Sequence, residues 1–214
     1  PIDSLRENKV MSLKTRFGNL GNILDFDNLT EENIYVLDSP ILTNSQLKKF
    51  KKFFSKKTKE IDCTFDISSS LKDRIEQIRE EAETSVREGS TCLILSDKNI
   101  SNKKASIPSI LTVGAVHSHL VKLGLRGYCS LNVECADALD THSFAILIGV
   151  GATTINPYLA IDSIYQRYEK KLFGKSDFES CVVKFKKSID AGLLKIMSKM
   201  GISVISSYRG GCNF

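Results

Sequence analysis

An alternation of short apolar runs with helical segments begins at residue 60 and constrains the fold more than any other feature. The apolar runs lie at 60–65, 91–95, 128–133, 152–155 and 202–205. Helical periodicity is expected between them, over 71–88, 109–123, 141–148, 158–172 and 179–200. Continuous apolar strands separated by helices are typical of a parallel sheet that is covered on both faces.

A further short run at 33–37 brings the count to about six strands. We therefore expect an α/β fold with a mostly parallel sheet flanked by helices, either doubly wound or resembling part of a barrel. A complete eight-fold barrel needs about 250 residues, and this chain has 214. No internal repeat or low-complexity linker interrupts it, so we expect a single domain over 1–214, with an irregular segment 1–59 before the regular alternation of 60–214.

Lysines are concentrated in one stretch, 48–59, where Phe50, Phe53 and Phe54 interleave with them. This spacing predicts an amphipathic helix with the phenylalanines toward the core and a solvated lysine face, capped by Thr43 or Asn44. The alternative is a basic surface that binds anions or nucleic acid. No recognised nucleic-acid module accompanies the charge, so we expect no nucleic-acid partner.

The six cysteines are scattered and form no C-x-x-C pair. Buried free thiols fit this distribution better than disulfides or a zinc site, and they favour a reducing, cytoplasmic location. No run of 18 apolar residues predicts a membrane span, and no signal peptide is recognisable. The first and last residues indicate a fragment cut from a longer chain.

Candidate catalytic residues are few. His117 and His119 are two positions apart, so on one helix they cannot face a single metal ion. The acidic run after the strand at 128–133 includes Glu134, Asp137 and Asp140, with His142 close by. These residues mark either a ligand site or the acid-rich start of a helix, and we favour the helix start.

The loop after the last apolar run, with Tyr208, Arg209 and Gly210, follows a strand end, where α/β folds place their sites. It is either a functional loop or the exit of the chain toward a neighbouring domain. A free-standing α/β module that binds a small molecule would use Glu134, Asp140 and Arg209. The residues alone predict an α/β domain without a self-sufficient active site.

Several runs together resemble the central domain of the large subunit of glutamate synthase. They extend over nearly the whole chain and are closest to those of the bacterial NADPH-dependent type. The most specific run is GLLKIMSKMGIS at 192–203, which leads to SYRGG at 207–211. The others include GNLGNIL at 18–24, LDSPIL at 37–42 and NPYLA at 156–160.

The resemblance implies a longer enzyme that makes two glutamates from glutamine, 2-oxoglutarate and a reductant. In this family a glutaminase domain releases ammonia, and a tunnel carries it to an FMN domain that holds an iron–sulfur cluster. NADPH is served by a small partner subunit. The present chain would connect the glutaminase and FMN domains, without catalytic, cofactor-binding or metal-binding residues of its own.

The resemblance also implies that the central domain helps to line the ammonia tunnel. Met11, Ser12, Ser39 and Thr43 lie in the matching N-terminal segments, and their small or apolar side chains suit a narrow passage for a neutral molecule. Tyr208, Arg209 and Gly210 would form the junction with the next domain.

Overall fold

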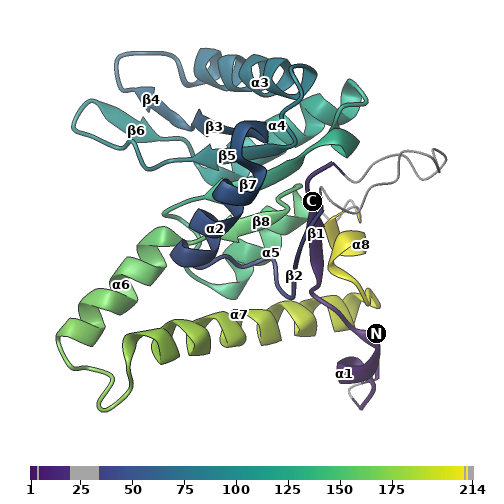
Figure 1. Ribbon diagram of the computed structural model, residues 1–214, viewed down its shortest axis with the longest axis vertical. Helices are drawn as coiled ribbons and strands as arrows, with labels where there is room; N and C mark the ends of the chain where they lie inside the picture. The colour runs from purple at the N-terminus through teal and green to yellow at the C-terminus, as the bar shows by residue number, and fades with distance from the viewer. Residues whose placement is uncertain (4, 20–33, 210, 212–214) are drawn as a thin grey trace.

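The computed structural model describes residues 1–3, 5–19, 34–209 and 211 (Figure 1). A twisted parallel sheet lies in the upper half of the view, and the long helix α7 runs beneath it. The elements, in chain order, are α1 Glu7–Val10, β1 Thr15–Phe17, β2 Tyr35–Leu37, α2 Asn44–Phe54, β3 Thr58–Asp62, β4 Thr64–Asp66, α3 Leu71–Arg87, β5 Cys92–Ser96, β6 Lys104–Ser106, α4 Ser109–Lys122, β7 Ser130–Glu134, α5 Thr141–Gly149, β8 Thr154–Asn156, α6 Tyr158–Glu169, α7 Phe178–Met200 and α8 Ile205–Arg209.

The main sheet has four parallel strands in the order β3-β5-β7-β8. The α/β class predicted from the sequence is confirmed. Each strand lies beside the next parallel strand along the chain, so the order never reverses. A doubly wound sheet reverses its strand order at a switch point. The sheet therefore resembles part of a barrel, which was the second of the two predicted arrangements.

The predicted count of about six parallel strands was too high. The run at 33–37 provides β2, which pairs antiparallel with β1 and lies outside the main sheet. The run at 202–205 contributes only a single parallel bridge between Ser12 and Val204, and Ile205 already begins α8. The run at 60–65 is interrupted at Cys63, after which β4 pairs antiparallel with β6.

Both faces of β5 are covered, as its continuous apolar sequence predicts. Leu93 and Leu95 belong to the large core cluster that also includes residues of α3, α4 and α5. Cys92 and Ile94 point to the opposite face and join a smaller cluster with residues of β1 and α2. Successive side chains of a strand alternate between faces, so one apolar run serves two cores.

Local caps explain where the helices begin. Thr43 starts α2 with a capping box: its hydroxyl accepts from the amide of Gln46, and the Gln46 side chain accepts from the amide of Thr43. The side chains of Asp140 and Asp177 cap α5 and α7 by accepting from the amides of Ser143 and Ser180. A side-chain oxygen at this position satisfies a backbone amide that has no partner within the helix.

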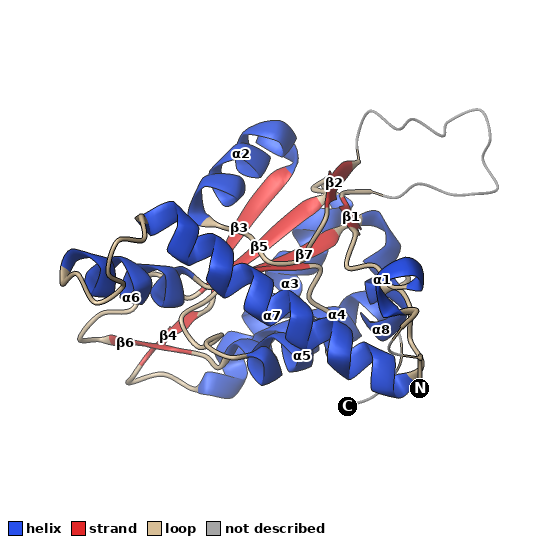
Figure 2. Ribbon diagram, turned by 90° about the horizontal axis from the view of Figure 1, so that it is seen from below, coloured by secondary structure: helices blue, strands red, loops and turns tan. Residues whose placement is uncertain are grey.

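The first and last segments of the chain lie side by side. The amide of Ser12 donates to the carbonyl of Ser203 at 2.8 Å, and the amide of Ile205 donates to the carbonyl of Ser12 at 3.1 Å. The amide of Ile2 donates to the carbonyl of Ser198 at 2.8 Å. Figure 1 and Figure 2 both place α1 and α8 on the same side of the molecule.

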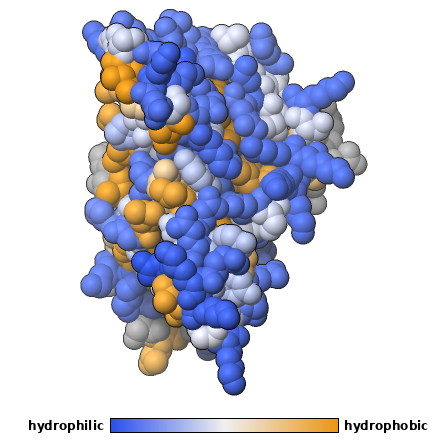
Figure 3. All heavy atoms as spheres, turned by 90° about the vertical axis from the view of Figure 1, so that its left-hand side faces the viewer, coloured by the Kyte–Doolittle hydropathy of each residue, from blue (hydrophilic) through white to orange (hydrophobic). Residues whose placement is uncertain are grey.

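The surface has no single dominant apolar face in the view of Figure 3. On the side where α6, β4 and β6 lie, hydrophilic areas separate several smaller apolar ones. Scattered apolar side chains are normal on a protein surface. Over the described ranges, no helix combines the length and the apolarity needed to cross a bilayer.

Candidate functional site

The carboxyl ends of the parallel strands hold a group of contacting polar side chains. Glu134, the last residue of β7, is buried. Its carboxylate accepts from the Ser96 hydroxyl at 2.9 Å and contacts the Lys98 ammonium at 2.6 Å, with Lys51 farther away at 3.9 Å. In parallel α/β folds, ligands bind outside this edge of the sheet. Here the buried carboxylate is already neutralised by lysines of the same chain.

Asp97 lies beside this pair and is also buried. One carboxylate oxygen accepts from the amide of Ala136 at 3.0 Å, while Oδ1 has no hydrogen-bond partner. Burial, aided by the negative charge of Asp137, raises the pKa of Asp97. Burial and a hydrogen bond to Asp97 raise the pKa of Tyr158. The Lys98 ammonium lies 5.0 Å from the centre of the Tyr158 ring.

The acidic residues after β7 divide between two structural roles. Asp140 is the N-cap of α5, with Oδ1 accepting from the amide of Ser143 at 2.8 Å. Asp137 accepts from the amide of Ser109 at 2.9 Å and so supports the start of α4. The predicted role at the start of the following helix is confirmed for Asp140, whereas Asp137 supports the start of another helix, α4. Glu134 instead belongs to the ion-paired group at the sheet edge, and His142 is exposed.

At the opposite, amino end of the sheet, two arginines lie close together. Arg126 donates to the carbonyl of Cys129 at 2.6 Å, to that of Gly151 at 2.9 Å and to His117 Nδ1 at 3.1 Å. Nε of Arg209 donates to the carbonyl of Ala152 at 3.0 Å. Burial, together with the two arginines, lowers the pKa of His117 to about 4, so this imidazole stays neutral.

The three residues proposed for a free-standing ligand pocket do not meet. Glu134 is at the carboxyl end of β7, whereas Arg209 contacts Ala152, just before the amino end of β8. Asp140 is engaged at a helix cap. The alternative pocket of Glu134, Asp140 and Arg209 is therefore not formed, because Glu134 and Arg209 lie at opposite ends of the sheet. Tyr208 is buried beside Arg209, and Gly210 lies outside the described residues.

The four predicted tunnel residues lie in the segments that lead into the sheet, and their polar groups have partners within the chain. The Ser39 hydroxyl donates to Asp190 at 2.6 Å and accepts from the amide of Ile41 at 3.1 Å. Thr43 caps α2. The Ser12 hydroxyl accepts from the amide of Lys14 at 3.1 Å, and Met11 is half-buried against the main core.

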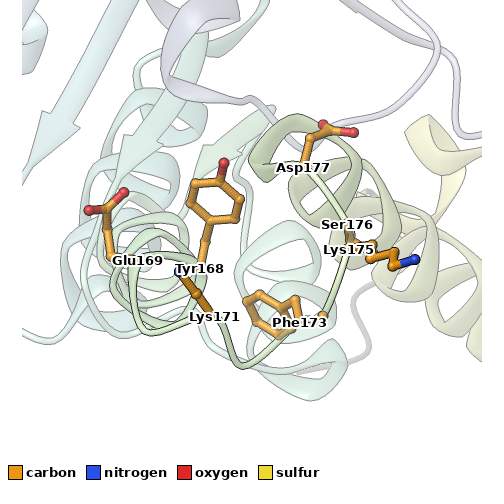
Figure 4. A pocket seen from close by; sticks show the side chains of 8 residues that line it. Tyr168, Glu169, Lys171, Phe173, Lys175, Ser176 and Asp177 are labelled. Atoms are coloured by element: carbon orange, nitrogen blue, oxygen red, sulfur yellow. The ribbon is translucent and has the colours of Figure 1, made fainter.

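Two hollows open near the helices α6 and α7. The larger, about 600 Å³, lies between the start of α2 and the two helices, and its lining includes Thr43, Ile161 and Val182. A second, of about 480 Å³, lies in the turn between α6 and α7 (Figure 4). In that view the side chains of Glu169 and Lys175 point in opposite directions.

The histidines and cysteines form no metal site within the described ranges. His119 pairs with Glu83 at 2.8 Å, while His117 contacts Arg126, so the two histidines face different neighbours as their spacing predicts. The five described cysteines are buried and free, which confirms the prediction for them; Cys212 lies outside the described residues. Burial raises the pKa of the Cys63 thiol to about 12.

The lysine-rich stretch is a helix only as far as Phe54. Phe50 and Phe54 are buried as predicted, but Phe53 is 48% exposed and packs edge-on against Tyr35 and Phe54. Lys51 pairs with Glu60 at 2.7 Å. Lys59 lies on β3 rather than on the helix, and it contacts Glu81 at 3.5 Å. Neighbouring acids therefore offset part of this positive charge.

Sequence reasoning missed the groups around Arg126 and Asp97. Asp97 could have been found from the sequence, because it directly follows the apolar run of β5, and ligand sites of α/β folds lie at this end of the strands. Arg126 could not have been found in this way, because it lies in a turn after α4 that has no distinctive sequence. Its contact with the segment before β8 is seen only in the structure. Arginine is mostly exposed in proteins, so its position along the chain did not indicate burial.

Comparison with known proteins points to one family. The model of the glutamate synthase central domain matches residues 1–214. The NADPH-type glutamate synthase large chain of Azospirillum brasilense is 53% identical over 100% of this chain. The ferredoxin-dependent enzyme of Pyropia yezoensis and the NADPH-type large chain of Bacillus subtilis (strain 168) are 41% and 40% identical, each over 98% of this chain. The chain spans 14% of the length of each of these relatives.

Among solved structures, a flavocytochrome b2 mutant with benzoylformate has a TM-score of 0.50 at 13% identity, covering 78% of this chain and 37% of the other. This likeness concerns the fold alone and agrees with the barrel-like strand order. The family is shown by the sequence comparisons, which extend over the whole chain. The chain belongs to the glutamate synthase central domain family.

Proposed function

We propose that this chain is the connecting domain of a glutamate synthase large chain and has no catalytic activity of its own. The observation that carries this proposal is the pairing of the two end segments, in which Ser12 bonds to both Ser203 and Ile205. In a longer chain, the domains before and after this one would be attached to these two segments. Because the segments are hydrogen-bonded to each other, both neighbouring domains would lie on the same side of this domain. That arrangement suits a spacer between a domain that produces an intermediate and a domain that consumes it.

The whole enzyme would make two glutamates from glutamine, 2-oxoglutarate and reducing equivalents. The glutaminase domain of the same chain would release ammonia, and the FMN domain, with its iron–sulfur cluster, would use the ammonia in the reductive step. We propose NADPH, served by a small partner subunit, as the electron source, and a cytoplasmic location in nitrogen assimilation. The 53% identity to the Azospirillum NADPH-type chain supports the choice of donor.

The residues of this domain do not fit those cofactors. An iron–sulfur cluster needs cysteine thiolates that converge on one point. The five described cysteines are buried and belong to no group of three or more potential metal ligands among the described residues, and burial keeps the thiols of Cys63 and Cys92 protonated by raising each pKa to about 12. We therefore assign cluster binding to other parts of the enzyme, and we propose the same for the flavin.

At the carboxyl edge, the buried carboxylate of Glu134 is held by Ser96 and Lys98. A general base must be free to take a proton from its substrate. The ion pair with the Lys98 ammonium at 2.6 Å occupies the Glu134 carboxylate and limits that freedom. This arrangement supports a structural role for the edge of the sheet that often carries the active site in related folds.

For the tunnel, we propose Met11, Ser12, Ser39 and Thr43 as wall residues. Ammonia must pass without being held or protonated. The hydroxyls of Ser12, Ser39 and Thr43 already have partners within the chain, which reduces their capacity to bind a passing molecule. The Met11 thioether offers no proton donor and adapts its shape to irregular spaces.

The test is a Met11→Ala variant in the full-length enzyme. Shortening a wall side chain should let ammonia escape, so glutamine hydrolysed should exceed glutamate formed by reduction, while each separate half-reaction stays nearly intact. Val10→Ala, at an exposed neighbouring position, is the control. An unchanged ratio of the two products in Met11→Ala would remove Met11 from the wall.

A further inference from the structure

Two arginine side chains are attached to consecutive carbonyls of one short turn. Arg126 donates to the carbonyl of Gly151 at 2.9 Å, and Arg209 donates to that of Ala152 at 3.0 Å. They come from widely separated parts of the chain, the turn after α4 and the last described helix, α8. Both guanidinium groups thereby lie at the amino end of β8.

No acidic side chain of the described residues pairs with either arginine. The acceptors of Arg126 are backbone carbonyls, the Thr153 hydroxyl and His117. For Arg209, burial and then the charge of Arg126 lower the pKa to about 10. Charged groups that leave water are normally paired with an opposite charge, because an unpaired buried charge is costly. Two like charges in one place increase that cost.

Arg209 differs from Arg126 in having unused donors. Arg126 donates from all three of its nitrogens. Arg209 uses only Nε, and its two Nη nitrogens make no hydrogen bond to a described residue, although they are not sealed from the surface. Two free Nη donors on one guanidinium match the two oxygens of a carboxylate.

We propose that Arg209 binds a carboxylate side chain of the longer glutamate synthase chain, outside residues 1–214, and thereby anchors this domain to its neighbour. Arg209 belongs to the segment that leaves the domain, which Ser12 and Ile205 attach to the entering segment. Relatives extend far beyond this region, which covers 14% of their length. The proposal rests on the connecting role proposed above and adds the chemistry of the contact.

The first experiment uses the full-length Arg209→Lys variant with a water-soluble carbodiimide. The reagent activates a carboxylate, and a lysine amine in contact with it displaces the activating group as a urea and forms an amide. Mass spectrometry of peptides should show position 209 linked to an aspartate or glutamate outside 1–214. The ion pair of Lys98 with Glu134, at 2.6 Å, is the internal positive control. The exposed Arg167→Lys variant, treated in parallel, should give no such link.

A link from position 209 to an acid within 1–214, such as Asp25, Asp27, Glu31 or Glu32, would overturn the proposal. So would the absence of any link while Lys98 and Glu134 are joined. The cross-linking result does not depend on the ratio of glutamine hydrolysed to glutamate formed in Met11→Ala. Failure of the Arg209 contact can therefore be distinguished from failure of the tunnel role.

Amide hydrogen exchange gives a second measurement that does not depend on the reach of lysine. In full-length Arg209→Met, exchange should become about tenfold faster in a segment outside residues 1–214, because that segment loses its anchor. Arg209→Lys should show a smaller increase in the same segment, since it keeps the charge. A change confined to 1–214 in Arg209→Met would show that Arg209 stabilises only its own domain.

Discussion

Gly151 is the residue whose identity the structure explains most directly. Its φ of +126° lies in a region that side chains disfavour, and the ring of His117 packs against it. A β-carbon at this position would lie 2.4 Å from Cγ of His117, well inside van der Waals contact. The glycine therefore permits both the turn before β8 and the approach of the histidine that accepts from Arg126.

Gly151→Ala should lower the free energy of unfolding by roughly 2–4 kcal/mol, because overpacking adds to backbone strain. Gly89→Ala is the matched control: its φ is +94°, but a β-carbon would meet nothing within 4 Å. The control should cost about 1–2 kcal/mol from strain alone. Urea denaturation measures both variants, and equal losses would contradict a role for the His117 contact.

His117 should make stability depend on pH. Its pKa in the folded protein is about 4, below the ordinary 6.5, because burial and two arginines disfavour the charged ring. The folded state therefore takes up a proton less readily than the unfolded state. The contribution of His117 to stability is complete above pH 6.5 and is lost progressively as the pH falls toward 4.

The measurement is the urea midpoint at pH 7 and at pH 5. The fall in midpoint should be smaller in His117→Gln, whose amide oxygen can still accept from Arg126 but does not titrate. His142→Gln, at an exposed position, should behave like the parent protein. An equal fall in His117→Gln would assign the pH dependence to other groups.

At the scale of elements, the long helix α7 lies below the sheet and contacts the helices that flank it. It runs from Phe178 to Met200 and ends at Gly201, as its sequence predicts. It packs mainly on α5 and α6 rather than directly on the strands. At its crossing with α5, a β-carbon on Gly192 would lie 2.5 Å from Cγ2 of Thr141, so the glycine permits the close approach.

Leu193→Ala should lower the free energy of unfolding by about 2–5 kcal/mol, because this side chain is 1% exposed and its loss leaves a cavity. Leu194→Ala should cost less, since Leu194 is only partly buried against the same core. Met200→Ala, with 42% exposure, serves as the surface control and should stay below about 1 kcal/mol. Chemical denaturation measures the loss of unfolding free energy in the three variants. A reversed order of the losses would show that α7 is rotated about its own axis, with a different face toward the core.

At the scale of the whole molecule, the domain carries buried charge at both ends of its sheet. Glu134 is neutralised by lysines at the carboxyl edge, whereas Arg126 and Arg209 have no acidic partner among the described residues at the amino edge. The charge at the carboxyl edge is paired within the chain. The charges at the amino edge are suited to the contact with an outside carboxylate proposed above.

The purified chain should hydrolyse no glutamine and bind neither flavin nor iron, because Glu134 is ion-paired with Lys98 and the described residues group no metal ligands. Absorbance near the flavin bands, iron analysis and a glutaminase assay check this, with the full-length enzyme as positive control. Stoichiometric flavin or iron in the purified chain would contradict the connecting role.

The sequence by itself determined the α/β class, the boundaries of most helices and the family. Apolar runs such as that of β5, the caps at Asp140 and the closing Gly201 are local signals, which depend on neighbours along the chain. The resemblance that identified the family likewise rests on many short runs. These features do not need the distances between segments to be known.

Only the tertiary structure decided the number of parallel strands and the two charged groups. The run at 202–205 has a strand-like composition, yet it meets Ser12 through one bridge and then turns into α8. Arg209 and Glu134 both follow apolar runs, yet they lie at opposite ends of the sheet. Strand pairing and the burial of a charge depend on which distant segments come together, and single-chain periodicity carries no information about that.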